Sequence, residues 1–118
     1  MKVSEQLLQC AAEVRRGWAQ GALEDINGGV CAHGAMNRVV SGDASVLMTG
    51  EELPKKMRLT EYLWKALGHY SVVNWNNAPS QTQENVAQAF ELAAILAEQD
   101  EARISVSGTM PECVGVAQ

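Results

Sequence analysis

The segment at residues 72–80, Val-Val-Asn-Trp-Asn-Asn-Ala-Pro-Ser, constrains the fold most, because a short β-branched run gives way to a turn and then to a long amphipathic pattern. Asparagine side chains can bond the backbone of such a turn, and a tryptophan can bury its ring while its indole N–H finds an acceptor. We therefore expect a strand near 71–75, a structural corner, and a helix over about 82–99. The corner consists of Trp75, Asn76, Asn77 and Pro79.

The composition favours one mainly helical domain. A chain of 118 residues can bury a single core, and 47% hydrophobic with 19% charged residues is typical of globular proteins. Aromatic residues make up only 5%, whereas alanine is abundant, so small aliphatic side chains must form most of the core. Such a core suits closely packed helices.

Three further helices are expected before the corner. Ser4 can cap a helix over 4–16, with Gly17 at its end, and a second helix of about ten residues follows Val30. A third covers 54–67. Gly34 lies inside the second helix, where glycine costs about 1 kcal/mol relative to alanine, so we expect another backbone to pack against that turn.

The C-terminal part alternates polar and apolar residues over 103–107, as an edge strand does. We predict a minor strand pair between 71–75 and 102–106. The expected fold is thus mainly α, a single domain over 1–108 of about four helices, followed by a flexible tail over 109–118.

The charge balance disfavours a nucleic-acid partner. Nine Lys and Arg oppose fourteen Asp and Glu, giving a formal charge of −5, whereas phosphate binding draws on clustered cations. The local group of Lys55, Lys56 and Arg58 is interpreted as the solvated face of a helix.

No cofactor or metal site is expected, because phosphate loops, dinucleotide fingerprints and metal-ligand spacings are missing from the sequence. Cys31, His33, His69 and Cys113 carry zinc-type donors without a recognised spacing. Three cysteines without a Cys-x-x-Cys pair fit a reducing compartment. With no signal peptide or apolar stretch of about 20 residues, we expect a cytoplasmic protein without membrane contact.

One catalytic hypothesis rests on Cys31, which begins a predicted helix whose N-terminus favours a thiolate. His33 lies two residues from Cys31 and would point in a different direction on a helix, so His69 would act as the base. Asn76, or Asn74 or Asn77, would orient it, giving a cysteine-dependent hydrolase or transferase. The alternative is that Cys31 is a small buried core residue, as free cysteines commonly are.

A second hypothesis is an interaction surface formed by Trp18, Trp64 and Tyr70, since tryptophan and tyrosine are enriched at the centres of protein interfaces. Packing in the core is the alternative for each ring. The alanine-rich helix over 82–99 can serve the core or a dimer seam, so a homodimer remains an alternative.

Three short motifs resemble a known family. They are Gly17-Trp18-x-Gln20-Gly21, Cys31-x-x-Gly34-Ala35 with Arg38, and Trp75-Asn76-Asn77-x-Pro79-x-x-Thr82. Their order and spacing are similar to a family of small uncharacterised proteins of actinobacteria and their phages. That family usually has aspartate where this chain has Asn77, which weakens a catalytic role for the position. The resemblance implies no activity. We therefore expect a small cytoplasmic accessory protein that acts by binding another protein, such as a phage product that modulates a host factor.

Overall fold

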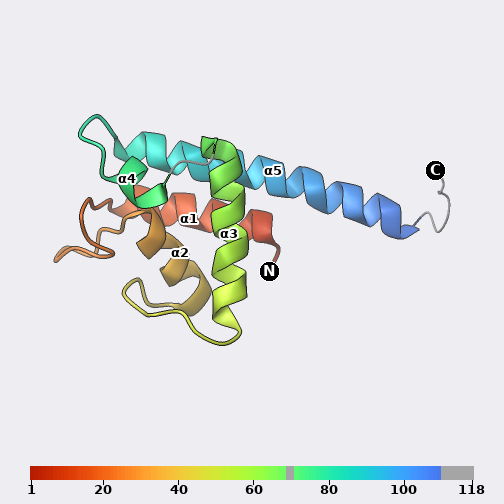
Figure 1. Ribbon diagram of the computed structural model, residues 1–118, viewed down its shortest axis with the longest axis horizontal. Helices are drawn as coiled ribbons and strands as arrows, with labels where there is room; N and C mark the ends of the chain where they lie inside the picture. Colours follow the sequence, from red (N-terminus) through yellow and green to blue (C-terminus); the bar gives the residue numbers. More distant parts are fainter. Residues whose placement is uncertain (69–70, 110–118) are drawn as a thin grey trace.

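Five α-helices and their connections make up the part of the protein that the computed structural model describes, residues 1–68 and 71–109, with side chains described up to residue 104 (Figure 1). The prediction of a mainly α fold is confirmed. The helices are α1 (Val3–Arg16), α2 (Ala32–Ser41), α3 (Glu52–Leu67), α4 (Val72–Asn76) and α5 (Gln83–Thr109).

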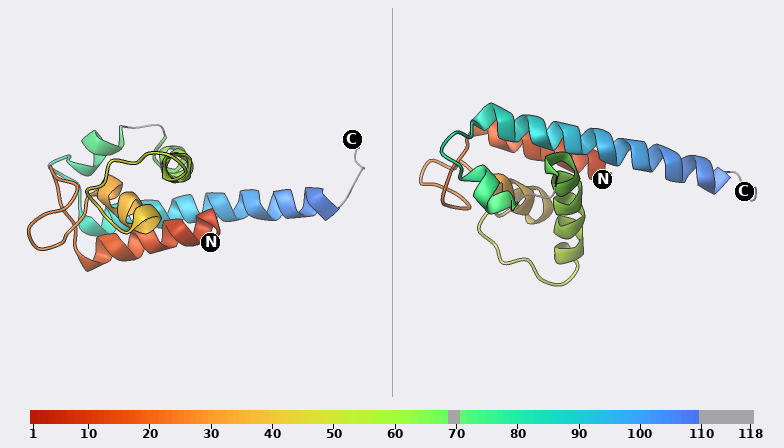
Figure 2. Two further views of the ribbon diagram at one scale, coloured as in Figure 1. Left: turned by 90° about the horizontal axis from the view of Figure 1, so that it is seen from below. Right: turned by 45° about the horizontal axis from the view of Figure 1, so that its top comes forward.

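Helices α1 and α5 form the most extensive helix–helix contact of the fold. The two helices run antiparallel and side by side, and the C-terminal part of α5 extends beyond the other helices (Figures 1 and 2). Apolar side chains at helical spacing are fully buried on both, including Leu7 and Val14 on α1 and Phe90 on α5. Polar contacts join α1 to α5 near both ends of α1. Arg15 forms ion pairs with Glu84 and Glu91, and Ser4 donates hydrogen bonds to Glu101.

Helix α3 crosses α1 and α5 at a steep angle, and α2 packs beside its lower half in the view of Figure 1. Leu59 and Leu63 of α3 and Met36 of α2 are fully buried in the same core. The Tyr62 hydroxyl donates a 2.6 Å hydrogen bond to Asp100, which ties α3 to α5. That carboxylate and partial burial raise the pKa of Tyr62 to about 12.

The helix ends agree with the sequence in part. Gly17 is the C-cap of α1, as predicted. Ser4 is not the N-cap, since α1 begins at Val3 and the Ser4 hydroxyl instead bonds Glu101. At the start of α5 the Thr82 hydroxyl accepts from the Asn85 amide, so the cap lies just before the first helical residue.

The predicted strand pair is wrong. Residues 72–76 form the short helix α4 because Ser71 supplies an N-cap, its hydroxyl accepting from the Asn74 amide. Residues 102–106 belong to α5, which continues to Thr109 instead of ending near 99. The sequence also predicts that the domain ends at residue 108 and that a tail covers 109–118. Residues 110–118 lie outside the described residues.

The connection over residues 17–31 folds back on itself without forming a regular strand. Isolated bridges join Val30 to Trp18 and to Glu24. Arg38 of α2 fixes this loop, because its guanidinium bonds Glu13, Glu24 and the Gly28 carbonyl.

Gly34 explains the close approach of this loop to α2. A Cβ at position 34 would lie 2.0 Å from the carbonyl oxygen of Leu23, so only glycine fits. The expectation of a backbone packed against Gly34 is confirmed.

Within residues 1–68 and 71–109, no helix combines the length and apolar character needed to cross a membrane.

Candidate functional site

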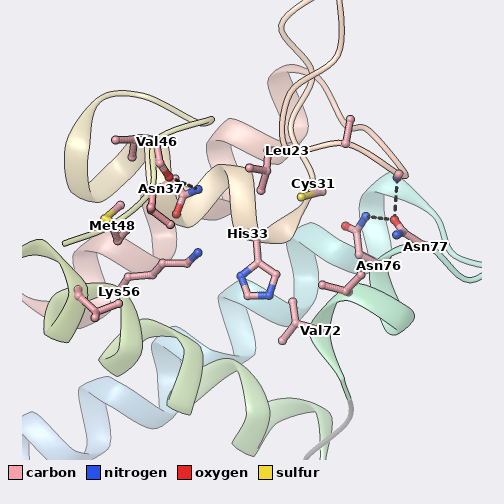
Figure 3. Close-up of a pocket in the computed structure, with 15 residues that line it drawn as sticks. Leu23, Cys31, His33, Asn37, Val46, Met48, Lys56, Val72, Asn76 and Asn77 are labelled. Atoms are coloured by element: carbon pink, nitrogen blue, oxygen red, sulfur yellow. Dashed lines mark hydrogen bonds between the residues drawn. The ribbon is translucent and has the colours of Figure 1, made fainter.

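A cavity of about 560 Å³ opens where the 17–31 loop, the start of α2, the 43–51 connection, α3 and α4 meet (Figure 3). Its volume lies within the range of small-ligand and side-chain pockets. Most of the lining surface is apolar, and six of the lining residues carry polar groups: Cys31, His33, Asn37, Lys56, Asn76 and Asn77. Such a lining suits an apolar occupant that also carries a few polar atoms.

Asn76 lines the cavity, and its buried side chain is hydrogen-bonded to the surrounding structure. The residue is 1% exposed, and its Oδ1 accepts from the Trp18 indole N–H at 3.0 Å and from the Ala32 amide at 3.1 Å. Its Nδ2 donates to the Ala19 carbonyl and to Asn77 Oδ1. All four hydrogen-bonding positions of the amide are thus occupied, and they join the end of α4 to the 17–31 loop and to α2.

Asn77 uses only its acceptor in this arrangement. Its Oδ1 accepts from the Gly21 amide at 2.9 Å as well as from Asn76. Gln20 completes the corner by donating to the carbonyls of Asn76 and Ala78. A carboxylate at position 77 would serve the same two donors, so the amide here and the aspartate expected in related sequences fit one structural role.

Lys56 and His33 face each other across the floor of the cavity. Lys56 extends from α3 toward His33 and Asn37 (Figure 3). Burial lowers the pKa of Lys56, and burial together with the Lys56 charge lowers the pKa of His33 to about 4. At neutral pH the imidazole of His33 is therefore uncharged. Among the described residues no carboxylate forms an ion pair with Lys56.

Two buried polar atoms in the cavity wall find no hydrogen-bond partner among the described residues: Nδ1 of His33 and Oδ1 of Asn37. Asn37 is 2% exposed, and its Nδ2 donates to the Ala44 carbonyl at 2.8 Å. That bond fixes the amide so that Oδ1 is the atom left over. A buried acceptor without a donor costs about 1–3 kcal/mol, so an occupant that supplies an N–H or O–H would be stabilised here.

The mouth of the cavity carries four exposed aliphatic side chains, which we call the aliphatic rim: Leu23, Leu47, Leu53 and Val73. Leu47 is 85% exposed and Val73 is 52% exposed. Exposed apolar groups gathered around a cavity are typical of surfaces that bind a partner or ligand.

The sequence-based catalytic residues are brought together only in part. Cys31 is the N-cap of α2, where its Sγ accepts from the Gly34 amide at 3.4 Å, and it lines the cavity with Asn76. Asn76 has no free hydrogen-bonding atom with which to orient a histidine. His69 lies outside the described residues.

The histidine found in the cavity is instead His33. Sequence reasoning set it aside because residues two apart on a helix point in different directions. Cys31, however, precedes the first helical residue, so both side chains reach the same cavity.

The predicted interaction residues lie in different places. Trp18 is partly buried against the core and its indole N–H is bonded to Asn76. Trp64 is 42% exposed on α3 and does not line the cavity. Tyr70 lies outside the described residues. In the corner, Trp75 packs against the core and Pro79 is exposed.

Lys56 corrects the interpretation of the local cationic group. Lys55 and Arg58 are exposed on α3, as predicted, whereas Lys56 is partly buried in the cavity. Lys56 differs from these neighbours because it lies one turn before the half-buried Thr60, whose hydroxyl contacts Met36 of α2.

In the part of the chain that the structure describes, no three His, Cys, Asp or Glu side chains gather in a way that could hold a metal ion.

The corner and the cavity lie in the part of the chain that matches a known family. A model of DUF6197, a family of unknown function, matches residues 2–96. The chain belongs to DUF6197. The matched range includes the whole cavity lining and ends inside α5, so the extended end of that helix lies beyond the DUF6197 match. Comparison with curated proteins and with solved structures gave no match.

Proposed function

We propose that this DUF6197 protein is a binding protein that accepts an apolar segment of another protein in the cavity. The observation that carries the proposal is the aliphatic rim around an open cavity in which Lys56 is the one cationic residue among the described lining residues. Burying apolar surface contributes roughly 25 cal/mol per Å², so a partner that covers the rim and fills the cavity gains most of its affinity there. As the biological role of this binding we propose an accessory function, such as modulation of a host factor.

The hydrogen-bonded corner supports this role by making the cavity rigid. Asn76 and Gln20 hold the loop that carries Leu23 against the helix that carries Val73. A preformed pocket loses less conformational entropy on binding than a mobile one, which increases affinity.

Affinity capture from a lysate of the organism that encodes the protein tests the proposal when three baits are compared. Val73→Glu places a charge in the rim, whereas Leu92→Glu places the same charge on the exposed face of α5, where Leu92 is 46% exposed. We expect a partner that is captured by the wild type and by Leu92→Glu and lost by Val73→Glu. A partner lost by Leu92→Glu and retained by Val73→Glu would contradict the proposal.

A second candidate is a cysteine-dependent hydrolase or transferase, favoured by the position of Cys31 at a helix N-terminus inside the cavity. His33 is a poor candidate for the base that would activate Cys31. Burial and the nearby Lys56 lower its pKa to about 4, so it is a weak base at neutral pH. His69 is the base that this candidate requires.

Thiol labelling separates the two functions. We expect iodoacetamide to modify Cys31 at the rate of an ordinary accessible thiol, because the binding function needs no activated thiolate. Labelling of Cys31 at least about tenfold faster, abolished by His69→Ala, would favour the enzyme. Cys10 is the internal control, since it is fully buried and burial raises the pKa of its thiol.

A further inference from the structure

The polar atoms of the cavity indicate which part of a partner would enter it. Four features must be satisfied together: the aliphatic lining, the Lys56 amino group, which has no ion pair among the described residues, and the two buried atoms without a partner there, Asn37 Oδ1 and His33 Nδ1. The occupant must therefore combine an apolar group, an anion and an N–H or O–H. These groups must also lie close together, because a single cavity of about 560 Å³ holds them all.

We propose that the cavity receives the C-terminal residue of a partner polypeptide. The terminal carboxylate pairs with Lys56 Nζ and accepts from His33 Nδ1, the amide N–H of the same residue donates to Asn37 Oδ1, and its apolar side chain packs against the aliphatic lining. This inference rests on the proposed function and names the part of the partner that is bound.

A chain terminus fits better than an internal acidic residue. In a C-terminal residue the carboxylate, the amide N–H and the side chain all branch from one Cα. An internal Asp or Glu carries the carboxylate on its own side chain, so the aliphatic lining would be left to a neighbouring residue. Capture of a terminal carboxylate is also one of the recurring ways in which proteins bind peptides.

The local charges agree with an anionic occupant. Lys55 and Arg58 are exposed on α3 and do not line the cavity, so Lys56 is the cation that faces the occupant. A partly buried ammonium loses hydration, and a carboxylate placed against it replaces that hydration with a charge-assisted hydrogen bond.

Binding to an array of seven-residue peptides tests the inference. The peptides are immobilised through their N-termini, end in Leu, Ile, Val, Met or Phe, and are each made as the free acid and as the C-terminal amide. A third set is amidated and carries one internal Glu. We expect the wild-type protein to bind free acids about 10- to 100-fold more tightly than the matched amides, as expected for a hydrogen bond to a charged group.

Variants assign that preference to the cavity. Lys56→Met should remove the difference between acid and amide, Lys56→Arg should retain it, and Lys55→Met should leave it unchanged as the exposed control. Circular dichroism of each variant shows that the fold is kept. Loss of the preference in Lys55→Met alone would overturn the inference.

The remaining outcomes separate this inference from the proposed function. Equal binding of acids and amides, still abolished by Val73→Glu, would overturn the carboxylate inference and leave the cavity as the binding surface. Exclusive binding of the internal-Glu peptides, or of none of the three sets, would also overturn the inference. Peptide binding that Val73→Glu leaves unchanged would overturn the proposed function as well.

Discussion

Replacing Asn76 or Asn77 with aspartate should have very different effects on stability, although the two residues are adjacent and the chemical change is the same. Asn76 donates two hydrogen bonds through Nδ2, to the Ala19 carbonyl and to Asn77 Oδ1. In Asn76→Asp both donors are lost and a carboxylate oxygen faces two acceptors at about the same 3.0–3.1 Å. Asn77 accepts two hydrogen bonds through Oδ1, which a carboxylate accepts equally well.

The magnitude follows from the burial of Asn76. The two lost hydrogen bonds contribute about 1 kcal/mol each. The Ala19 carbonyl is left without this donor, which costs about 1–3 kcal/mol more, whereas Asn77 Oδ1 keeps its bond from the Gly21 amide. We therefore expect Asn76→Asp to lower the free energy of unfolding by roughly 3–5 kcal/mol at pH 7. Asn77→Asp should change it by less than about 0.5 kcal/mol, because the side chain is exposed and keeps both bonds.

Urea denaturation followed by circular dichroism measures both values. With an m-value on the order of 1–2 kcal/mol/M, Asn76→Asp should move the midpoint down by roughly 1.5–5 M. The loss should become smaller as the pH falls toward 4, because burial raises the pKa of the introduced carboxyl group and its protonated form regains a donor. A loss below about 1 kcal/mol for Asn76→Asp, or equal losses for the two variants, would refute the reasoning.

Three further predictions concern other parts of the site. Burial lowers the pKa of His33 to about 4, so the unfolded chain binds a proton first and stability should fall by about 1–2 kcal/mol between pH 6.5 and 4; denaturation of His33→Gln across this window should show a smaller change. Gly34→Ala should cost more than about 2 kcal/mol in urea denaturation, since its Cβ would clash with a carbonyl oxygen. Arg38→Met should cost about 1–2 kcal/mol because its two ion pairs are partly buried, whereas Arg16→Met, with a side chain 71% exposed, should cost less than about 0.5 kcal/mol by the same measurement.

The sequence predicted the features that depend on local patterns. The period of apolar residues located three of the helices closely, and an interior glycine correctly indicated a close backbone contact at Gly34. It was misleading where a short pattern competed with longer-range effects. Two adjacent valines suggested a strand at 72–73, but the Ser71 cap and the bonds to Asn76 stabilise a helical turn.

The candidate site was less predictable, because its residues meet only through the fold. Asn76 bonds Trp18 and Ala32, which are 58 and 44 positions away in the chain. Lys56 resembled a surface lysine because the helical pattern gives the face of a residue, not the loop that later covers it. His33 was separated from Cys31 by a helical argument that does not apply to an N-cap residue.

Site-specific photocrosslinking tests most directly whether the cavity is the binding surface. A benzophenone side chain at position 73 lies in the aliphatic rim, and one at position 92 lies on the exposed face of α5. We predict that irradiation in a lysate of the native organism gives one crosslinked protein partner from position 73 and none from position 92. A partner crosslinked only from position 92 would contradict the account.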